Sequence, residues 1–256
     1  MAGPLIDHDI RGACERLREE AHVIPEPLRD WWIHYLDMHI EHYRSVIARL
    51  PNPKACGRLL EIGCVPGHLT VLLAGLGYDI TGVDIAPARV SELWRRHGIE
   101  ICRVDIESEP LPFEDQAFSC VLFTEILEHL RMNPIHALRE AARLLGSGGR
   151  LILSVPNITP IDRLGFLLGR DYQGDIIAEF QKLERCGHMG HIRLYSINEV
   201  RRLLNHVGFF NVRCAREGRL RGGWLTRLPF PWRDAFRSHV YFESSRYREL
   251  GAPSEA

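Results

Sequence analysis

Apolar residues follow two alternating patterns along this chain. Short apolar runs, such as RLLEI from residue 58 and AFSCVLF from residue 117, predict β-strands. Longer stretches between them repeat apolar residues at three- and four-residue steps, which predicts amphipathic helices. Ser196 and Glu199 form a capping-box pattern at the start of one such stretch, and Gly208 can end it.

This alternation predicts an α/β fold with a doubly wound, mostly parallel sheet, because parallel strands are joined by helical crossovers. We expect strands over residues 58–62, 79–84, 99–105, 117–123 and 150–156. In such sheets, ligands bind beyond the carboxyl ends of the strands. The residues that directly follow each strand are therefore the first candidates for chemistry.

The N-terminal part of the chain has a helical pattern without strands. In residues 28–50, aromatic and aliphatic side chains recur at helical spacing, and the PNPK stretch that follows can break the helix. This aromatic helix is well placed to form a lid over a ligand site. Its histidines, His34, His39 and His42, are dispersed around the helix, and we expect them at the surface.

Composition and charge narrow the class of protein. A chain of 256 residues with 45% hydrophobic and 25% charged residues is typical of a globular α/β protein. A formal net charge of −1 gives no global reason to expect a nucleic acid or an anionic membrane as partner. The seven cysteines are odd in number and never follow CxxC spacing, which favours buried, reduced thiols. No apolar run approaches the about 18 residues of a membrane span and no signal region is visible, so we expect a cytoplasmic protein.

Three features that suit a nucleotide-like ligand follow three successive strands. Gly63 and Gly67 form a glycine turn before a helix start, where backbone N–H groups and the helix dipole face the ligand. Asp84 follows the second strand and can accept hydrogen bonds from both hydroxyls of a ribose. Asp105 and Ile106 follow the third strand and combine a carboxylate with an apolar surface, which suits an adenine. Each feature alone is weak, but the three in register predict a cofactor site.

Four stretches carry a resemblance to a known family: LLEIGCVPG, GVDIAP, VDIESEPLPFEDQAFSCVLFTEILEHL and LREAARLLGSGGRLILSVPN. Their order and spacing resemble the class I S-adenosylmethionine-dependent methyltransferases over residues 55–215. The resemblance implies a Rossmann-like, seven-stranded sheet that ends in an antiparallel hairpin. It also implies S-adenosyl-L-methionine as the cofactor. The residues expected to hold it are Glu61, Gly63, Gly67, Asp84, Ile85, Asp105, Ile106 and Thr124.

Val65 departs from the glycine pattern of that family, which commonly has glycine at this position. A positive φ there would strain a β-branched residue. Pro66 follows, however, and a residue before proline is pushed toward the extended conformations that valine adopts easily. We therefore expect a functional loop with an extended backbone at Val65. A non-catalytic binding subunit with a lapsed cofactor site is the alternative from another class.

The fourth strand ends in TEILEHL, which contains a candidate metal site. Glu125, Glu128 and His129 follow i, i+3, i+4 spacing and share one face if a helical turn begins at Glu125. Two carboxylates and an imidazole form half of an octahedral site for Mg²⁺ or Mn²⁺. The alternative is a metal-free site in which the leucines pack, Glu128 caps or pairs, and a histidine acts as the base.

A second histidine stretch, CGHMGHIRLY, lies beyond the fifth strand in a loop that adjoins the same sheet edge. ExxEH with a distant histidine resembles the metal site of the small-RNA 2′-O-methyltransferases, and ExxEH alone also resembles the ubiquinone-pathway O-methyltransferases. The resemblance implies His191 as the fourth metal ligand, beside Glu125, Glu128 and His129. His188 is left as a spare ligand or general base. The candidate catalytic residues are His188, His129 and Glu125.

These features predict an S-adenosylmethionine-dependent O-methyltransferase that acts on a hydroxyl of a small molecule, a saccharide or vicinal diol, with help from a divalent metal ion. We expect an N-terminal helical cap over residues 1–52 and a methyltransferase domain over residues 53–256, with an insertion at about 158–190. An RNA 2′-O-methyltransferase is the alternative enzyme, although the near-neutral charge and the lack of an attached RNA-binding module disfavour nucleic acid. No membrane partner is expected, and a homodimer is left open.

Overall fold

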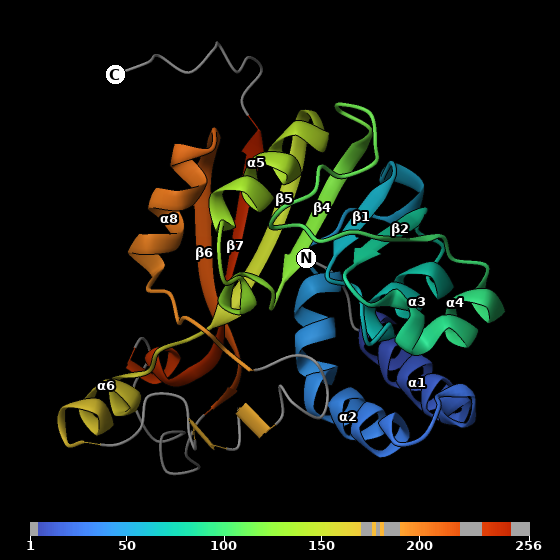
Figure 1. The fold of residues 1–256 in the computed structure, drawn as a ribbon, viewed down its shortest axis with the longest axis horizontal. Coiled ribbons are helices and arrows are strands. Elements are labelled where there is room, and N and C mark those ends of the chain that lie inside the picture. Colours follow the sequence, from blue (N-terminus) through green and yellow to red (C-terminus); the bar gives the residue numbers. More distant parts are fainter. Residues whose placement is uncertain (1–4, 170–175, 178–179, 182–189, 221–231, 247–256) are drawn as a thin grey trace.

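The computed structural model describes residues 5–169, 176–177, 180–181, 190–220 and 232–246. Its strands are β1 (Leu59–Ile62), β2 (Ile80–Asp84), β3 (Ile101–Arg103), β4 (Phe118–Thr124), β5 (Leu145–Pro156), β6 (Phe209–Leu220) and β7 (Arg237–Arg246). They form one seven-stranded sheet in the order β3-β2-β1-β4-β5-β7-β6 (Figure 1). Neighbouring strands among β1 to β5 pair in parallel, whereas β7 pairs antiparallel with both β5 and β6. The predicted α/β fold with a Rossmann-like, seven-stranded sheet is confirmed.

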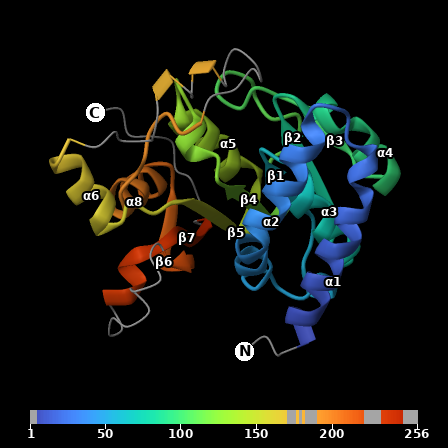
Figure 2. The ribbon, with the colours of Figure 1, turned by 90° about the horizontal axis from the view of Figure 1, so that it is seen from below.

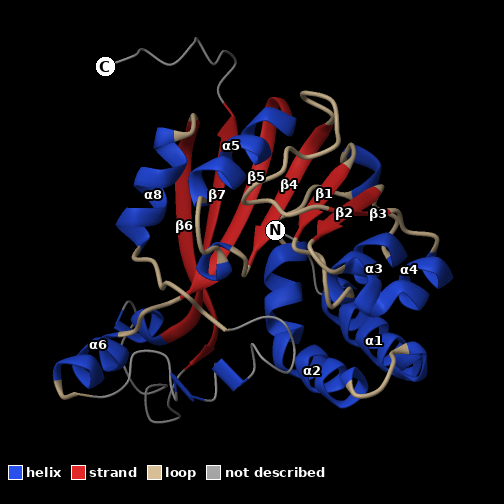
Figure 3. Ribbon diagram, viewed as in Figure 1, coloured by secondary structure: helices blue, strands red, loops and turns tan. Residues whose placement is uncertain are grey.

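Helices surround this sheet on both faces (Figure 3). The α-helices are α1 (Leu5–Glu19), α2 (Leu28–Ile47), α3 (His68–Gly75), α4 (Ser91–His97), α5 (Pro134–Leu144), α6 (Pro160–Leu167) and α8 (Ile197–His206). Short 3₁₀ helices are η1 (Glu20–Val23), η2 (Pro53–Ala55), η3 (Pro87–Val90), η4 (Leu127–His129) and η6 (Trp232–Phe236). Within the described residues, none of the helices combines the length and the apolar character that a membrane crossing requires.

The predicted capping box begins α8 as expected. The Ser196 side chain accepts a hydrogen bond from the Glu199 N–H, and the Glu199 carboxylate accepts one from the Ser196 N–H. Asn133 caps α5 in a similar way, since its side chain accepts from the His136 N–H at 3.1 Å. The capping box fixes the start of α8 where the sequence pattern placed it, and Asn133 fixes the start of α5.

Alternating residues of the central strands divide the core into two layers. On β4, Val121 and Phe123 pack on the face covered by α5 and α8. Cys120 and Leu122 point to the opposite face, which α1, α2, α3 and α4 cover (Figure 2). All four side chains are almost fully buried, as expected for a central strand covered on both faces.

The two N-terminal helices belong to the second of these layers. Helix α1 lies within the expected helical cap, although the sequence pattern located a helix only over residues 28–50, and it packs against α2 and α3. The expectation that the α2 histidines lie at the surface holds for His34 but is wrong for His42, which is 4% exposed. Its burial follows from the packing of α2 against β7, where Tyr241 lies beside it. The proposed boundary between residues 52 and 53 stays a prediction.

Trp32 joins α2 to the loop between β1 and α3. Its side chain is fully buried, and its indole Nε1–H donates to the Pro66 carbonyl at 2.9 Å. Its ring also lies against His68, with centroids 4.2 Å apart. The N-terminal helix is therefore fastened to the glycine loop by a buried hydrogen bond as well as by apolar contact.

Replacement of Trp32 by phenylalanine removes this donor and leaves the Pro66 carbonyl without it. We expect Trp32→Phe to lower the free energy of unfolding by about 1–3 kcal/mol, because it combines a lost buried hydrogen bond with lost volume. Urea titration followed by circular dichroism measures the change. Trp31→Phe, at the neighbouring partly exposed position, is the control, and equal unfolding midpoints for the two variants would contradict the expectation.

Candidate functional site

A pocket lies between α2, the β1–α3 loop and the residues that follow β4. It is lined by Tyr35, His42, Tyr43, Glu61, Gly63, Cys64, Val65, Pro66, His68, Leu69, Thr124, Glu125 and Ile126. The aromatic N-terminal helix therefore forms one wall of the pocket, which agrees with its expected place over the ligand site. The opposite wall comes from the carboxyl ends of β1 and β4, where the topology of a doubly wound sheet places ligands.

The glycine loop has the backbone shape that a close-fitting ligand requires. Gly63 and Gly67 have φ values of 76° and 97°, which favour glycine. A Cβ atom at Gly63 would lie 1.9 Å from Ile126 Cδ1, and one at Gly67 would lie 2.7 Å from Leu93 Cδ2. Val65 is not among the described residues with positive φ. The valine therefore fits the loop, and its N–H donates to Asp84 Oδ2 at 3.0 Å.

The expected ribose and adenine residues stand at the ends of adjacent parallel strands. Asp84 ends β2 and also accepts from the Ala86 N–H at 2.8 Å, which fixes the orientation of its carboxylate. Burial raises the pKa of Asp84, and the backbone donors oppose this shift. Ile85 beside it is 51% exposed. Asp105 is held by the Glu107 N–H at 3.0 Å, and Ile106 packs on the core.

Glu61 places a buried carboxyl group in the pocket wall. It is 4% exposed, and its Oε2 accepts from the Thr70 hydroxyl at 2.6 Å. Burial raises the pKa of Glu61 to about 8. A cationic ligand group beside it would favour the ionised form, so this position suits the positively charged end of a ligand.

The residues of the ExxEH stretch do not share one helix face: Glu125 lies apart from Glu128 and His129. Glu125 has φ of 55°, and the helical turn begins only at Leu127. The Glu125 N–H and carboxylate both bond Ser154 on the neighbouring strand β5, at 3.2 and 2.7 Å. Three of the four expected metal ligands do come together: Glu128, His129 and His191 offer ligand atoms within 4.8 Å of one another. This set is called the Glu128 cluster below.

The Glu128 carboxylate is the most unusual group of the Glu128 cluster. It is fully buried, and within the described part of the chain neither of its oxygens has a hydrogen-bond partner. Burial and the nearby Glu125 raise the pKa of Glu128 well above the usual range. The His129 ring lies 5.1 Å from that of His191, and its Nδ1–H donates to the Gly190 carbonyl at 3.1 Å. An orphaned carboxylate beside two imidazoles is a donor set that fits a divalent cation.

Two predicted features fall wholly or partly outside the described residues. His188, the expected spare ligand or base, lies outside the described residues, as do residues 170–175, 178–179 and 182–189 of the expected insertion. Conversely, the structure adds His239 and His42 to the surroundings of Glu125. Sequence reasoning missed His239 because its place beside Glu125 depends on the antiparallel return of β7 along β5, where His239 pairs with Pro156.

A model of the methyltransferase domain family matches residues 32–213. The chain belongs to this methyltransferase family. The match covers the glycine loop, the acidic residues after β2 and β3, and the ExxEH stretch. The family match and the site together identify this protein as a class I S-adenosylmethionine-dependent methyltransferase. The predicted enzyme class and organic cofactor are confirmed.

The curated proteins that the chain resembles include ubiquinone biosynthesis O-methyltransferases. The chain is 36% identical over 124 residues to the ubiquinone biosynthesis O-methyltransferase of Xanthomonas oryzae pv. oryzae, covering 46% of this chain and 51% of that protein. It is 35% identical over 133 residues to the enzyme of the same name from Xanthomonas campestris pv. campestris, covering 50% and 54%. The chain thus matches about half the length of these relatives.

Solved structures show the same fold at low sequence identity. An S-adenosylmethionine-dependent methyltransferase from Thermotoga maritima superposes with a TM-score of 0.60 at 20% identity, covering 88% of this chain and 99% of that one. A second, from Archaeoglobus fulgidus, gives 0.57 at 16% identity, covering 83% and 99%. These likenesses support the methyltransferase fold of the chain and say nothing of its acceptor.

Substitution of Gly63 tests the glycine loop. In Gly63→Ala, the new Cβ would meet the Ile126 side chain on a backbone with φ of 76°. We expect affinity for S-adenosylhomocysteine, measured by calorimetry, to fall about 5- to 150-fold, as about 1–3 kcal/mol of strain implies. Gly75→Ala is the control, because a Cβ there would meet nothing within 4 Å. Equal affinity of both variants would exclude a tightly fitted loop.

The raised pKa of Glu61 predicts a pH dependence of stability. An unfolded glutamate releases its proton near about pH 4.3, whereas folded Glu61 keeps it up to a pKa of about 8. Between these values the folded state binds more protons, so stability falls as pH rises, by at most about 1.4 kcal/mol per pH unit for one such group. Urea titrations of the ligand-free protein check this. Glu61→Gln should reduce the fall, and an unchanged fall would show that Glu61 ionises normally.

Proposed function

We propose that this methyltransferase transfers the methyl group to a hydroxyl oxygen of a small molecule, with a divalent cation held by Glu128, His129 and His191. The observation that carries the metal assignment is the fully buried Glu128 carboxylate, whose two oxygens have no hydrogen-bond partner among the described residues. The name of the curated relatives, O-methyltransferase, supports oxygen as the acceptor atom.

The chain's own residues would bind and orient the cofactor. S-adenosyl-L-methionine, when bound, supplies a methyl group that its sulfonium activates for transfer. Gly63 and Gly67 allow the backbone to approach it closely, while Asp84 faces the ribose position. Glu61 offers its carboxylate to a cationic group. Thr124, buried at the end of β4, closes the pocket behind the reacting groups.

The Glu128 cluster would activate the acceptor. A divalent cation lowers the pKa of a coordinated hydroxyl and stabilises the alkoxide that develops during transfer. Two imidazoles and one carboxylate suit Mn²⁺ better than Mg²⁺, which prefers oxygen ligands. The bond from His129 Nδ1–H to the Gly190 carbonyl orients the ring so that Nε2 faces Glu128, with Nε2 and Oε1 3.9 Å apart. His129, as a ligand, and Glu125, in the pocket wall, are the proposed catalytic residues.

The acceptor class follows from the same cation. Two neighbouring oxygens can chelate one ion, so we assign a vicinal diol, either a catechol or a saccharide, as the acceptor class. The RNA alternative rests on the resemblance of Glu128, His129 and His191 to the metal site of the small-RNA 2′-O-methyltransferases. It has less support, because a formal net charge of −1 gives no global reason to expect a nucleic acid as partner. Its test is whether methyl transfer to a short RNA exceeds transfer to a catechol.

Methyl transfer from labelled S-adenosylmethionine to the probe 3,4-dihydroxybenzoate tests the proposal. We expect EDTA to abolish transfer and Mn²⁺ to restore it. His191→Gln should lower the rate by at least about 100-fold, because it removes a cation ligand. His206→Gln, an exposed histidine on α8, is the control. Binding of S-adenosylhomocysteine with transfer that is insensitive to EDTA and to His191→Gln would overturn the metal assignment, and absent cofactor binding would overturn the whole proposal.

A further inference from the structure

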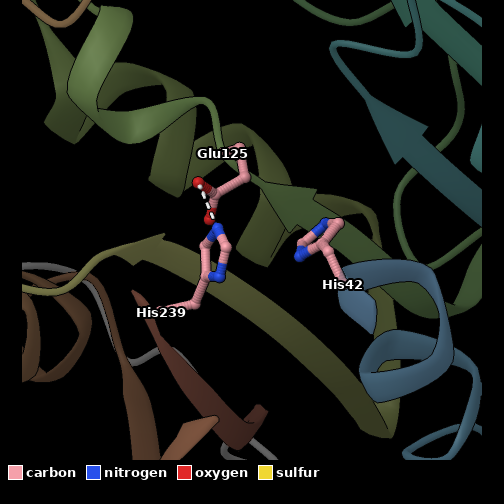
Figure 4. Close-up of side chains that lie close together, drawn as sticks. All are labelled: His42, Glu125 and His239. Atoms are coloured by element: carbon pink, nitrogen blue, oxygen red, sulfur yellow. Dashed lines mark ion pairs between the residues drawn. The ribbon is translucent and has the colours of Figure 1, made fainter. Parts of the chain in front are cut away.

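A second cluster of metal-ligating side chains adjoins the cofactor pocket. His42 on α2, Glu125 after β4 and His239 on β7 offer ligand atoms that all lie within 4.8 Å of one another (Figure 4). His239 Nε2 is 3.5 Å from Glu125 Oε2. These three residues, called the Glu125 cluster below, come from three elements that are far apart in the sequence.

The backbone at Glu125 is held in a conformation that directs its side chain into this cluster. Its φ of 55° is uncommon for a residue with a long side chain, and such strained positions concentrate at ligand sites. Ser154 stabilises this orientation of the Glu125 side chain, since its hydroxyl donates to Glu125 Oε1 at 2.7 Å. Oε1 is thus oriented by β5, while Oε2 faces His239.

In both histidines a hydroxyl group bonds the ring Nδ1 and fixes the orientation of the ring. His42 Nδ1 bonds the Tyr241 hydroxyl at 2.8 Å, and His239 Nδ1 bonds the Ser238 hydroxyl at 2.7 Å. Hydrogen bonds of this kind fix the ring orientation of metal-binding histidines. Burial, reinforced by His239, His39 and Arg49, lowers the pKa of His42 well below its ordinary value, so its imidazole is neutral. The neutral ring is the form that binds metal ions.

The distances are close to those that one ion imposes. Ligand atoms at about 2.1 Å from a tetrahedral ion lie about 3.4 Å from one another. The His239–Glu125 separation of 3.5 Å already matches this value, and the others lie within 4.8 Å. Small side-chain rotations would therefore complete the site without movement of the backbone.

We infer that His42, Glu125 and His239 form a second cation site, which takes a borderline first-row divalent ion such as Zn²⁺ or Fe²⁺. Two imidazoles and one carboxylate are the ligand set typical of these ions. The ion would join α2 to β4 and β7 at the pocket wall, since His42 and Glu125 both line the pocket. This site shares no ligand with the Glu128 cluster, so it stands or falls independently of the proposed metal assistance.

Equilibrium dialysis of chelator-stripped, full-length protein against Co²⁺, with its visible absorption as the second readout, tests the inference. We expect His42→Gln and His239→Gln each to weaken one Co²⁺ site by at least about 100-fold. His34→Gln, at the exposed position on the same helix, should leave that site intact, as should His191→Gln in the Glu128 cluster. Zn²⁺ should raise the thermal unfolding midpoint of wild type more than that of His239→Gln, which keeps only the Glu128 cluster.

The outcomes separate the two sites. Binding by His239→Gln with wild-type stoichiometry and affinity overturns the inference, and so does loss of all binding in His191→Gln alone. Circular dichroism establishes that each variant is folded. X-ray absorption at the Zn edge of Zn²⁺-loaded His191→Gln is a further check, because this variant leaves the Glu125 cluster unaltered. Two imidazoles in the first coordination sphere support the site, and coordination by oxygen alone overturns it.

Discussion

The burial of carboxyl groups at the ends of parallel strands is the constraint on which this molecule depends. Glu61 lies in β1, and Glu125 and Glu128 come shortly after β4. Because β1 and β4 are parallel neighbours, all three residues lie at one edge of the sheet. Burial raises the pKa of each of them. A positively charged ligand, whether a sulfonium, an ammonium or a metal ion, would therefore stabilise the ionised form of these buried carboxyl groups.

The N-terminal helix gives this edge its second wall. Trp32 bonds the Pro66 carbonyl, and Arg49 at the other end of the segment bonds Glu217 on β6 at 2.6 and 3.0 Å. Between them, His42 bonds Tyr241 on β7. The N-terminal segment is thus attached at both ends and in the middle, and Trp32 connects it directly to the glycine loop.

One backbone angle separates the two histidine-carboxylate clusters. Because Glu125 adopts φ of 55°, its carboxylate bonds Ser154 and faces His239, while Glu128 points toward His129 and His191. A regular helical turn from Glu125 would have placed both carboxylates on one face. Three of the residues expected from spacing and from the family resemblance, Glu128, His129 and His191, therefore lie together, while Glu125 lies in another cluster.

Local patterns in the sequence determined the strands, the capped helices, the glycine loop and the acidic residues at successive strand ends. These depend on neighbours within a few residues: the capping box at Ser196, the alternation on β4, and the extended preference of Val65 before proline. Only the tertiary structure decided which distant side chains meet. The burial of His42 and the approach of His239 to Glu125 arise because β7 returns antiparallel beside β5 and α2 packs across it. No periodicity within one segment encodes these two encounters, since each depends on contacts between segments that are more than 100 residues apart in the chain.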